Sequence, residues 1–495
     1  MTDNGVYILN PHYDLRTDKK RAIITNRTTD PIVNSFIGFV HPVYAIILSF
    51  FDGERNLSEV IGDVSTLLKK ERNVISNIIH PLLENDEERH FHFDDHHFSF
   101  PKKLLTRRLN TDNPKKYNPR DFFIHKEDMD LKSWRLNYPL DILFMVNTQC
   151  ATDCIYCYAD RRKNVSPISF ERLKDIMREA KELNLRSIDI TGGELFLKAD
   201  WETLLRELLS NGFMPYISTK CPISPDIIEK LKDMGIDKIQ ISIDSINKNE
   251  MMEILNVDEK YYHMMMKTFN NLDARGIAIY TNTQLMSINT KHIGELIDFL
   301  LSLENIKRIN MGAAGYSIYK GEERFLKYKP SLEAVKKVEQ HVNELKEIYK
   351  DKIAINFSGY QDKHSILDKD LEEKKKAFDK RARCSANFYS FVLLPDGKVT
   401  ICEELYWHPA FIIGDLKTQS IEEVWNSKRA LEIYNISRDM VRDESPCKNC
   451  AEFEPCHRFN GVCWKEVIYA YGYDNWDYAD PKCPHSTMPK NEYYL

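Results

Sequence analysis

The stretch Cys150-Ala151-Thr152-Asp153-Cys154-Ile155-Tyr156-Cys157 determines how the rest of this chain is interpreted. Its three cysteines are separated by three and then by two residues. The apolar run over residues 141–146, just before it, predicts a strand. The thiols then lie on a loop at the carboxyl end of a strand, where barrel folds hold their reactive groups. Three thiolates on one loop can bind three irons of a 4Fe-4S cluster and leave the fourth iron open.

This spacing, with Tyr156 directly before the third cysteine, resembles the radical S-adenosylmethionine (SAM) enzymes. The resemblance implies that Cys150, Cys154 and Cys157 hold the cluster, with Tyr156 beside the cofactor, and that the open iron binds the amino and carboxyl groups of SAM. In that family one electron cleaves SAM, and the resulting 5'-deoxyadenosyl radical abstracts hydrogen from the substrate. The alternatives are zinc, which usually pairs two cysteines with two more distant ligands, or buried cysteines without a metal.

The composition is that of a soluble globular protein. The 495 residues suffice for about three domains, with 42% hydrophobic and 29% charged residues. A net charge of -6 gives no reason to expect nucleic acid or a membrane surface as a partner. The apolar run over residues 43–51 is too short to span a bilayer, and no export signal is visible. All eleven cysteines except Cys221 fall in metal-like clusters, which indicates metal ligation in a reducing cytoplasm.

Residues 1–100 are expected to form a small separate domain. Asn56 and Glu59 give a capping signal at the start of one helix, and apolar residues repeat after them at helical spacing. We expect a polar turn over residues 14–20, strands over residues 6–9 and 21–26, and helices over residues 42–51, 57–69 and 73–84.

Residues 42–61, Pro-Val-Tyr-Ala-Ile-Ile-Leu-Ser-Phe-Phe-Asp-Gly-Glu-Arg-Asn-Leu-Ser-Glu-Val-Ile, resemble the PqqD-like peptide-recognition element. The resemblance implies a winged-helix-like domain that binds the leader of a ribosomally made peptide, by adding a strand to the edge of the sheet that contains residues 21–26. A winged-helix-like domain without a ligand is the alternative.

Two further segments separate this domain from the next. Residues 86–98 contain His90, His92, His96 and His97, which could bind a metal, although we expect a solvated strand or loop. Residues 101–137 are basic and polar and are expected to be a linker.

From residue 138 to 330 the pattern alternates between strands and helices. Such strand–helix units make a parallel sheet, because the connections are right-handed crossovers. The pattern fits the partial (β/α)6 TIM barrel of the radical SAM family, within an α/β fold. The expected strands are residues 141–148, 186–191, 214–218, 238–243, 277–285 and 307–311. The expected helices are residues 169–183, 201–210, 225–234, 261–275 and 292–303.

The strand ends carry further signals. Gly192, Gly193 and Glu194 follow the second strand, and in the family this motif holds the SAM amino group. Ser242 and Asp244 end the fourth strand, where the family binds the ribose and carboxylate of SAM.

Two features depart from related peptide maturases. The stretch over residues 251–256 lacks their usual His and Arg-Gly, so Lys220, after the third strand, is the candidate partner for the SAM carboxylate. The adenine contact is expected within residues 310–315. Cys221 is interpreted as an inert buried residue.

The C-terminal part continues the cysteine pattern. Residues 331–383 are expected to be a bridging helical segment, and residues 384–495 resemble the SPASM extension, which carries two auxiliary 4Fe-4S clusters. The resemblance implies that Cys447, Cys450, Cys456 and Cys483 hold the outer cluster. It assigns Cys384, Cys402 and Cys463 to the inner one, although six residues separate Cys456 from Cys463 where three are usual. Zinc bound by four of these seven is the alternative.

The resemblance covers nearly the whole chain. It implies a cytoplasmic radical SAM enzyme, with SAM and three 4Fe-4S clusters, that cross-links a ribosomal precursor peptide, with a thioether as the first choice of bond. Its partners would be that peptide and a flavodoxin or ferredoxin-type electron donor. Carbon–carbon or carbon–oxygen cross-links remain open. So does a sulfatase-maturase-like oxidation, in which Glu403, directly after Cys402, is the general base. A leader-binding iron-sulfur scaffold without activity is the non-enzymatic alternative.

Overall fold

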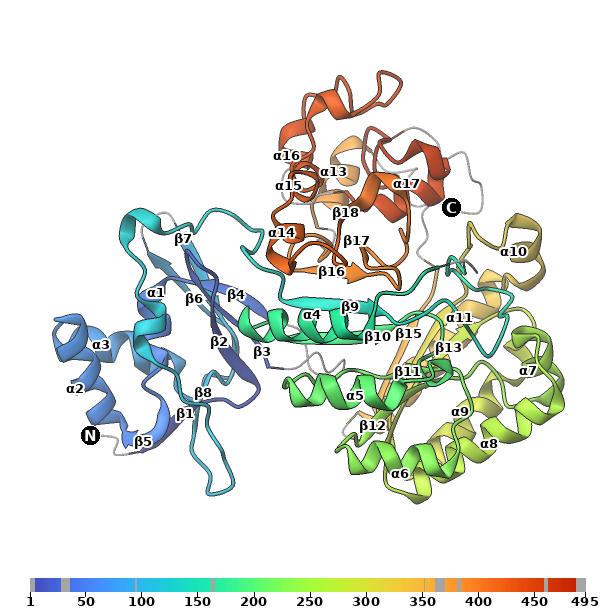
Figure 1. The fold of residues 1–495 in the computed structure, drawn as a ribbon, viewed down its shortest axis with the longest axis horizontal. Coiled ribbons are helices and arrows are strands. Elements are labelled where there is room, and N and C mark those ends of the chain that lie inside the picture. Colours follow the sequence, from blue (N-terminus) through green and yellow to red (C-terminus); the bar gives the residue numbers. More distant parts are fainter. Residues whose placement is uncertain are drawn as a thin grey trace. The chain divides into compact units, whose positions relative to one another are not determined.

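The computed structural model describes residues 5–27, 36–93, 96–161, 165–350, 352–360, 370–380, 384–457 and 462–486. The chain divides into two compact units, Met1–Tyr138 and Pro139–Leu495, each with its own core (Figure 1). None of the described helices is both long enough and apolar enough to cross a membrane.

The first unit contains two three-stranded antiparallel sheets and a hairpin (Figure 1). Its helices pack on them through buried side chains such as Ile47, Val64 and Ile75. The sheets have the orders β5-β1-β8 and β2-β3-β4, built from β1 Val6–Leu9, β2 Tyr13–Thr17, β3 Ala22–Asn26, β4 Ile37–Val40, β5 Asp52–Asn56 and β8 Leu105–Arg107. The hairpin is β6 Arg89–Phe93 with β7 His96–Phe100, and the helices are α1 Pro42–Leu48, α2 Leu57–Leu68 and α3 Arg72–Ile79.

Of two local sequence predictions in this unit, one is confirmed and the other is wrong. The capping box at Asn56 and Glu59 is formed at the start of α2, as expected. The expected polar turn over residues 14–20 is instead largely strand β2, whose Asp14 side chain is buried because Arg16 and Lys115 pair with it. As a result β3 is a central strand, and the edges of its sheet are β2 and β4.

Residues 101–137 are not a linker in the structure. Strand β8 pairs with β1, Phe122 is buried, and the Tyr117 hydroxyl donates a hydrogen bond to Asp14. The buried guanidinium of Arg21 donates to the backbone carbonyls of Ser133 and Arg135 and also contacts Asp18. The segment is therefore part of the first unit, although many of its residues are exposed.

The second unit contains two five-stranded sheets. The first has the order β10-β9-β16-β17-β18 and the second β11-β12-β13-β14-β15, with all five strands of the second parallel. A hydrogen bond connects the two sheets. The backbone N–H of Tyr216, two residues before β11, donates to the carboxylate of Asp189 on β10 at 3.0 Å. The strands are β9 Asp141–Met145, β10 Ser187–Thr191, β11 Ser218–Thr219, β12 Lys238–Ser242, β13 Ala278–Leu285, β14 Ile306–Ala313, β15 Ala354–Ser358, β16 Ser390–Leu393, β17 Lys398–Thr400 and β18 Ile412–Asp415.

The alternation expected for residues 138–330 is present, and the helices cover the sheets through apolar stripes (Figure 1). In α8, for example, Met265, Phe269 and Leu272 are buried. The helices are α4 Phe170–Glu182, α5 Trp201–Ser210, α6 Pro225–Asp233, α7 Lys248–Leu255, α8 Glu259–Ala274, α9 Ile293–Leu301, α10 Glu322–Tyr328, α11 Leu332–Tyr349, α13 Leu371–Asp379, α14 Ile421–Trp425, α15 Lys428–Tyr434, α16 Phe453–His457 and α17 Trp464–Tyr471.

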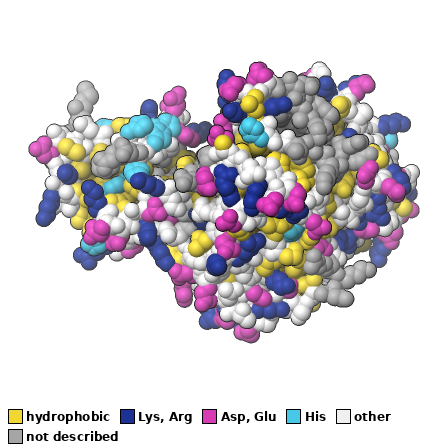
Figure 2. Space-filling view, turned by 90° about the horizontal axis from the view of Figure 1, so that it is seen from above, with side chains coloured by type: hydrophobic (Ala, Val, Ile, Leu, Met, Phe, Trp, Pro, Cys, Tyr) yellow, Lys and Arg dark blue, Asp and Glu magenta, His cyan; other side chains and the backbone are white. Residues whose placement is uncertain are grey.

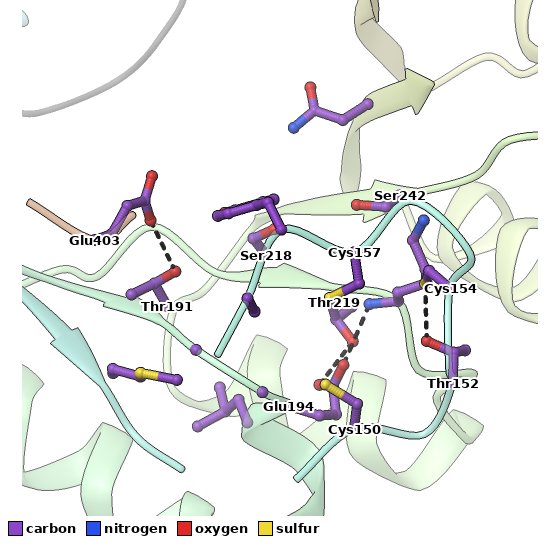
Figure 3. A pocket seen from close by; sticks show the side chains of 18 of the residues that line it. Cys150, Thr152, Cys154, Cys157, Thr191, Glu194, Ser218, Thr219, Ser242 and Glu403 are labelled. Atoms are coloured by element: carbon purple, nitrogen blue, oxygen red, sulfur yellow. Dashed lines mark hydrogen bonds between the residues drawn. The ribbon is translucent and has the colours of Figure 1, made fainter. Parts of the chain in front are cut away.

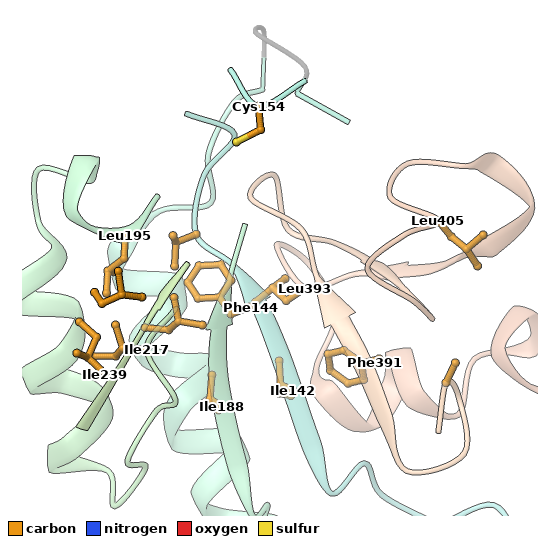
Figure 4. Packing of buried hydrophobic residues seen from close by; sticks show 14 of the residues in the cluster. Ile142, Phe144, Cys154, Ile188, Leu195, Ile217, Ile239, Phe391, Leu393 and Leu405 are labelled. Carbon is orange, nitrogen blue, oxygen red and sulfur yellow. The ribbon is translucent and has the colours of Figure 1, made fainter. Parts of the chain in front are cut away.

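Four strands of these two sheets, β15 to β18, lie outside the region expected to form the sheet. Strand β15, from the segment expected to be purely helical, pairs in parallel with β14. Strand β16, from the cysteine-rich C-terminal part, pairs in parallel with β9. The apolar side chains Ile142 and Phe144 of β9 thus pack between Ile188 of β10 and Phe391 of β16 (Figure 4). The cysteine-rich part therefore shares a sheet and a core with the strand that leads to Cys150.

Acidic and basic side chains are interspersed over the face of the molecule seen in Figure 2, which fits the near balance of charges in the composition.

Candidate active site

A cavity of about 290 Å³ opens where the parallel strands of the second unit end. The carboxyl ends of parallel strands share one edge of a sheet, so the segments after β9, β10 and β11 meet there. The triplet Cys150, Cys154 and Cys157 lines one side of the cavity, and Glu403 lies at the opposite end of the view in Figure 3. Of the residues predicted from the sequence, Gly192, Gly193, Glu194, Lys220, Ser242 and Tyr156 also line this cavity.

The cysteine loop is held by backbone contacts from a distant helix. Asp153 and Ile155 donate their N–H groups to the carbonyls of Leu255 and Ile254, at 2.9 and 3.0 Å, at the end of α7. The Ser317 hydroxyl donates to the carbonyl of Cys157 at 2.8 Å. Helix α7 was not expected from the sequence, and these contacts give it the role of a support for the loop.

The two glycines after β10 lie against this same loop. A Cβ on Gly193 would lie 1.9 Å from the backbone oxygen of Gln149, and Gly192 has a φ of +110°. The absence of a side chain at both positions lets the cysteine loop approach the segment after β10. Asn147 completes the contact, because its carbonyl accepts from Gly193 N and its side chain bonds the backbone of Glu194 in both directions.

Asn147 was missed in the sequence analysis. The available signal was its place two residues after β9, just before the first cysteine.

Glu194 is buried and lines the cavity. It accepts hydrogen bonds from the Thr219 hydroxyl at 2.8 Å and from the backbone N–H of Lys220 at 3.2 Å. Burial raises the pKa of Glu194 above its ordinary value, and these hydrogen bonds oppose that change. A buried carboxylate with neutral partners can bind an incoming ammonium group strongly.

Asp244 does not line the cavity but lies behind it. Its carboxylate accepts from the Tyr156 hydroxyl at 2.7 Å, from Lys220 Nζ at 2.8 Å and from the backbone of Gln284 at 2.9 Å. Lys220 also contacts the hydroxyl and ring of Tyr156. Lys220 faces the cavity with Asp244 already bound to it, so Asp244 acts in this structure by orienting Lys220 and Tyr156.

The two glutamates after Cys402 have different surroundings. Glu403 lines the cavity and accepts a hydrogen bond from Thr191 at 3.5 Å, and burial, followed by repulsion from Glu404, raises its pKa. Glu404 instead pairs with Lys465 at 2.8 Å and accepts from Tyr469 at 3.2 Å, on α17.

The C-terminal cysteines lie in two neighbourhoods. Burial raises the pKa of Cys463 to about 12 and that of Cys402 above its ordinary value, and in both cases the Cys384 sulfur adds to the increase. Burial likewise raises the pKa of Cys447 to about 12, with contributions from Cys483 and Cys450. Cys384, Cys402 and Cys463 thus lie near one another, as do Cys447, Cys450 and Cys483, and Cys456 lies on α16.

The residues of the cavity fit a cluster and SAM. Three cysteines on one supported loop face a cavity that also offers a buried carboxylate for an amino group. Within the described ranges, no three His, Cys, Asp or Glu side chains are close enough to share a single metal ion.

Comparison with known families agrees with this chemistry. Residues 145–300 match the radical SAM superfamily, and residues 384–451 match the iron-sulfur cluster-binding domain called SPASM. The second unit therefore contains a radical SAM domain and a SPASM domain. The first match begins at the end of β9 and so contains the cysteine loop, and the second contains Cys384, Cys402, Cys447 and Cys450.

Two curated relatives each match about half of this chain. A probable GTP 3',8-cyclase of Sulfurisphaera tokodaii is 25% identical over 267 residues, which cover 53% of this chain and 80% of the relative. A GTP 3',8-cyclase of a Sulfurovum species is 25% identical over 270 residues, which cover 52% of this chain and 72% of the relative.

Among solved structures, Streptococcus suis SuiB bound to the precursor peptide SuiA matches with a TM-score of 0.63 and 16% identity. The match covers 96% of this chain and 98% of SuiB. SuiB bound to SAM gives the same TM-score over 98% of this chain. At this identity the likeness concerns the fold.

Proposed function

We propose that this radical SAM enzyme modifies a ribosomally made precursor peptide by installing a cross-link. The observation that carries the proposal is the additional first unit, with its own sheets and core, which precedes the unit that bears the cavity. A fold likeness that extends over both units, to an enzyme solved with a precursor peptide, supports it. In this proposal the first unit is a PqqD-like, winged-helix-like domain that binds the leader, and the second contains a partial barrel.

The cavity residues have distinct roles in this proposal. Cys150, Cys154 and Cys157 hold the cluster, Glu194 receives the amino group of SAM, and Lys220 receives its carboxylate. When bound, the cluster and SAM supply a 5'-deoxyadenosyl radical that removes a hydrogen atom from the substrate. The narrow, half-buried cavity orients the substrate carbon and excludes water.

A thioether is the bond that we propose. Cys384, Cys402 and Cys463 supply three ligands to an inner auxiliary cluster, which leaves one position for a substrate thiolate. Glu404, two residues after Cys402, is engaged by Lys465 and Tyr469. A hard carboxylate is also a poor match for a sulfur-rich site. The remaining cysteines Cys447, Cys450, Cys456 and Cys483 are assigned to the outer cluster, which gives three clusters in all.

Glu403 supports a second candidate reaction. Its carboxylate lies in the cavity beside Thr191, and burial raises its pKa, as a general base requires. An oxidation like that of the sulfatase maturases, or a carbon–oxygen cross-link, would use this base directly.

Nucleotide chemistry is the competing function, because the curated relatives are GTP 3',8-cyclases. A triphosphate is usually held by several arginines and lysines. Among the described residues that line the cavity, Lys220 is the only lysine or arginine, and Asp244 already pairs with it. This favours an uncharged substrate segment such as a peptide.

The proposal includes a cytoplasmic location and a flavodoxin or ferredoxin-type electron donor. It is tested with enzyme reconstituted anaerobically, SAM, a low-potential reductant and the short peptides encoded beside its gene. The expected products are 5'-deoxyadenosine and a peptide that has lost two hydrogen atoms, as closure of a cross-link between S–H and C–H groups requires. The proposal fails if the peptides stay unchanged while GTP is consumed in a SAM-dependent reaction.

A further inference from the structure

A row of uncharged polar side chains crosses the second sheet of the second unit. The strand register aligns Ser242 of β12 with Asn282 of β13, Asn282 with Asn310 of β14, and Asn310 with Asn356 of β15. We call these four residues the amide row. They come from four different strands and lie at one level of the sheet.

Side-chain hydrogen bonds connect the amide row. Asn310 donates from Nδ2 to Asn282 Oδ1 at 3.2 Å, and Asn356 donates from Nδ2 to Asn310 Oδ1 at 3.2 Å. Arg308, two residues before Asn310, donates from Nε to the same oxygen at 3.0 Å. The three asparagines and this arginine therefore lie on one face of the sheet.

Formation of the sheet does not by itself require these residues. Strands of parallel sheets are usually apolar on both faces, since helices cover them. The adjacent level is largely apolar, because Ile241, Ile309 and Ile355 align there with one threonine, Thr281, and all four are almost completely buried. The side-chain amides of the row thus lie on one face of the sheet.

The polar face begins in the cavity and ends in solvent. Ser242 and Asn282 line the cavity, together with their neighbours Gln240 and Gln284. At the other end Asn356 is exposed, on the edge strand β15. The amide row therefore leads from the candidate active site to the open edge of the sheet.

The row retains hydrogen-bonding capacity. An asparagine side chain offers two N–H donors and a carbonyl oxygen with two lone pairs. In the ranges that the structure describes, Asn282 uses only its oxygen in these side-chain bonds and Asn356 only its nitrogen. Arg308 Nη1 is buried, and no described residue accepts a hydrogen bond from it. This N–H is therefore an unused donor next to the amide row.

We propose that the amide row binds the main chain of the substrate peptide. This inference rests on the proposed function and adds which part of the second unit holds the substrate. A side-chain amide carries the same donor and acceptor as a peptide group, so Asn282, Asn310 and Asn356 can pair with main-chain groups of a bound segment. Arg308 orients Asn310 through the hydrogen bond from its Nε. Because the row is uncharged, the binding tolerates different side chains in the peptide.

The test uses the SAM-loaded holoenzyme and a defined probe. The probe is the blocked pentapeptide acetyl-Ala-Ser-Cys-Ala-Ser-amide, with a second version whose main-chain nitrogens are methylated. Methylation removes the N–H donors and keeps the side chains, so it isolates recognition of the main chain. Dissociation constants are measured anaerobically by calorimetry up to about 10 mM, because a few hydrogen bonds support only millimolar affinity.

Wild-type enzyme is expected to bind the unmethylated peptide at least about tenfold more tightly than the methylated one. The double variant Asn310→Ala/Asn356→Ala should lose about the same factor, since two hydrogen-bonding partners disappear. Gln340→Ala, an exposed amide on α11, is the matched control and should bind as wild type does. Circular dichroism checks that all three proteins are folded, and formation of 5'-deoxyadenosine without peptide should be equal in wild type and Gln340→Ala.

Equal affinity for the two peptides, no binding up to the highest concentration, or unchanged binding by the double variant would overturn the inference. In that case the amide row only fastens the strands together. Failure of the proposed function is a different result, namely wild-type enzyme that binds the pentapeptide through the row but leaves every precursor peptide unmodified.

Discussion

The Cα of Gly193 lies so close to the carbonyl oxygen of Gln149 that an added Cβ would be 1.9 Å from that oxygen. The obstacle is backbone, and it belongs to the loop that carries Cys150. The geometry of the cysteine loop and the absence of a side chain at residue 193 therefore depend on each other.

Gly193→Ala is expected to displace the cysteine loop and to prevent the first cluster from binding. Overpacking against backbone costs about 1–3 kcal/mol or more, and here the shift falls on metal ligands. Iron content after anaerobic reconstitution should fall by about four per chain. Gly294→Ala is the control, because no atom lies within 4 Å of its added Cβ, and it should keep all its iron. Full iron content in Gly193→Ala would show that the loop adapts.

Metal content tests the number of clusters. Three clusters predict about twelve irons per chain, and changing Cys150, Cys154 and Cys157 together to Ala should remove about four. Iron and zinc are measured by mass spectrometry on the same samples. Zinc binding with iron near zero would contradict the cluster assignment for all ten cysteines.

Glu194→Ala is expected to weaken SAM binding, because a buried ammonium loses about 3 kcal/mol or more when its carboxylate partner is removed. Glu194→Gln separates charge from hydrogen bonding, since the amide oxygen can still accept from Thr219 and Lys220. Titration with SAM should rank wild type first, the Gln variant second and the Ala variant last. Equal affinities would mean that the amino group binds elsewhere.

The first unit is expected to fold alone as residues 1–138 but not as residues 1–100. The shorter piece lacks β8 and Phe122, and it leaves Arg21 without the carbonyls of Ser133 and Arg135. Removing one partner from a buried charge costs about 3–5 kcal/mol, and the lost Phe122 burial adds about 1.5–3 kcal/mol. Thermal unfolding followed by circular dichroism compares the two pieces. A cooperative transition of residues 1–100 at the same temperature would contradict this prediction.

Enzyme without residues 1–138 should still cleave SAM but should not modify a peptide that carries its leader. Peptide modification at the native rate would show that the first unit is not needed to bind the leader.

The inner auxiliary cluster is expected to bind a substrate thiolate. A cysteine-containing substrate should then change the absorption and paramagnetic-resonance spectra of the reconstituted enzyme, whereas its Cys→Ser variant should not. The measurement is best made with Cys150, Cys154 and Cys157 changed to Ala, so that the first cluster does not contribute. Identical spectra with both peptides would show that this cluster does not bind the substrate thiolate, and electron transfer would then be its only proposed role.

The sequence alone determined the chemistry-bearing stretches of the second unit. Cys150 to Cys157, Gly192 to Glu194, and Ser242 each follow a strand with a clear apolar pattern, and parallel strands bring their carboxyl ends to one edge. Their meeting around one cavity followed from strand order, without knowledge of side-chain contacts. The helix stripe Val335, Val338 and Val342 was likewise readable, because its spacing is local.

Tertiary structure decided the features that depend on register and on distant partners. Residues 101–137 look like a linker until Asp14, Arg21 and strand β1 supply their partners. Strand β16 is a short apolar run like many others, and only its pairing with β9 joins the cysteine-rich part to the cysteine loop. The amide row could not be predicted from the sequence either, because nothing in the sequence around Asn282, Asn310 and Asn356 relates them to one another. They become one surface only because two crossovers set their three strands at the same level, and contacts of that range leave no periodic signal in the chain.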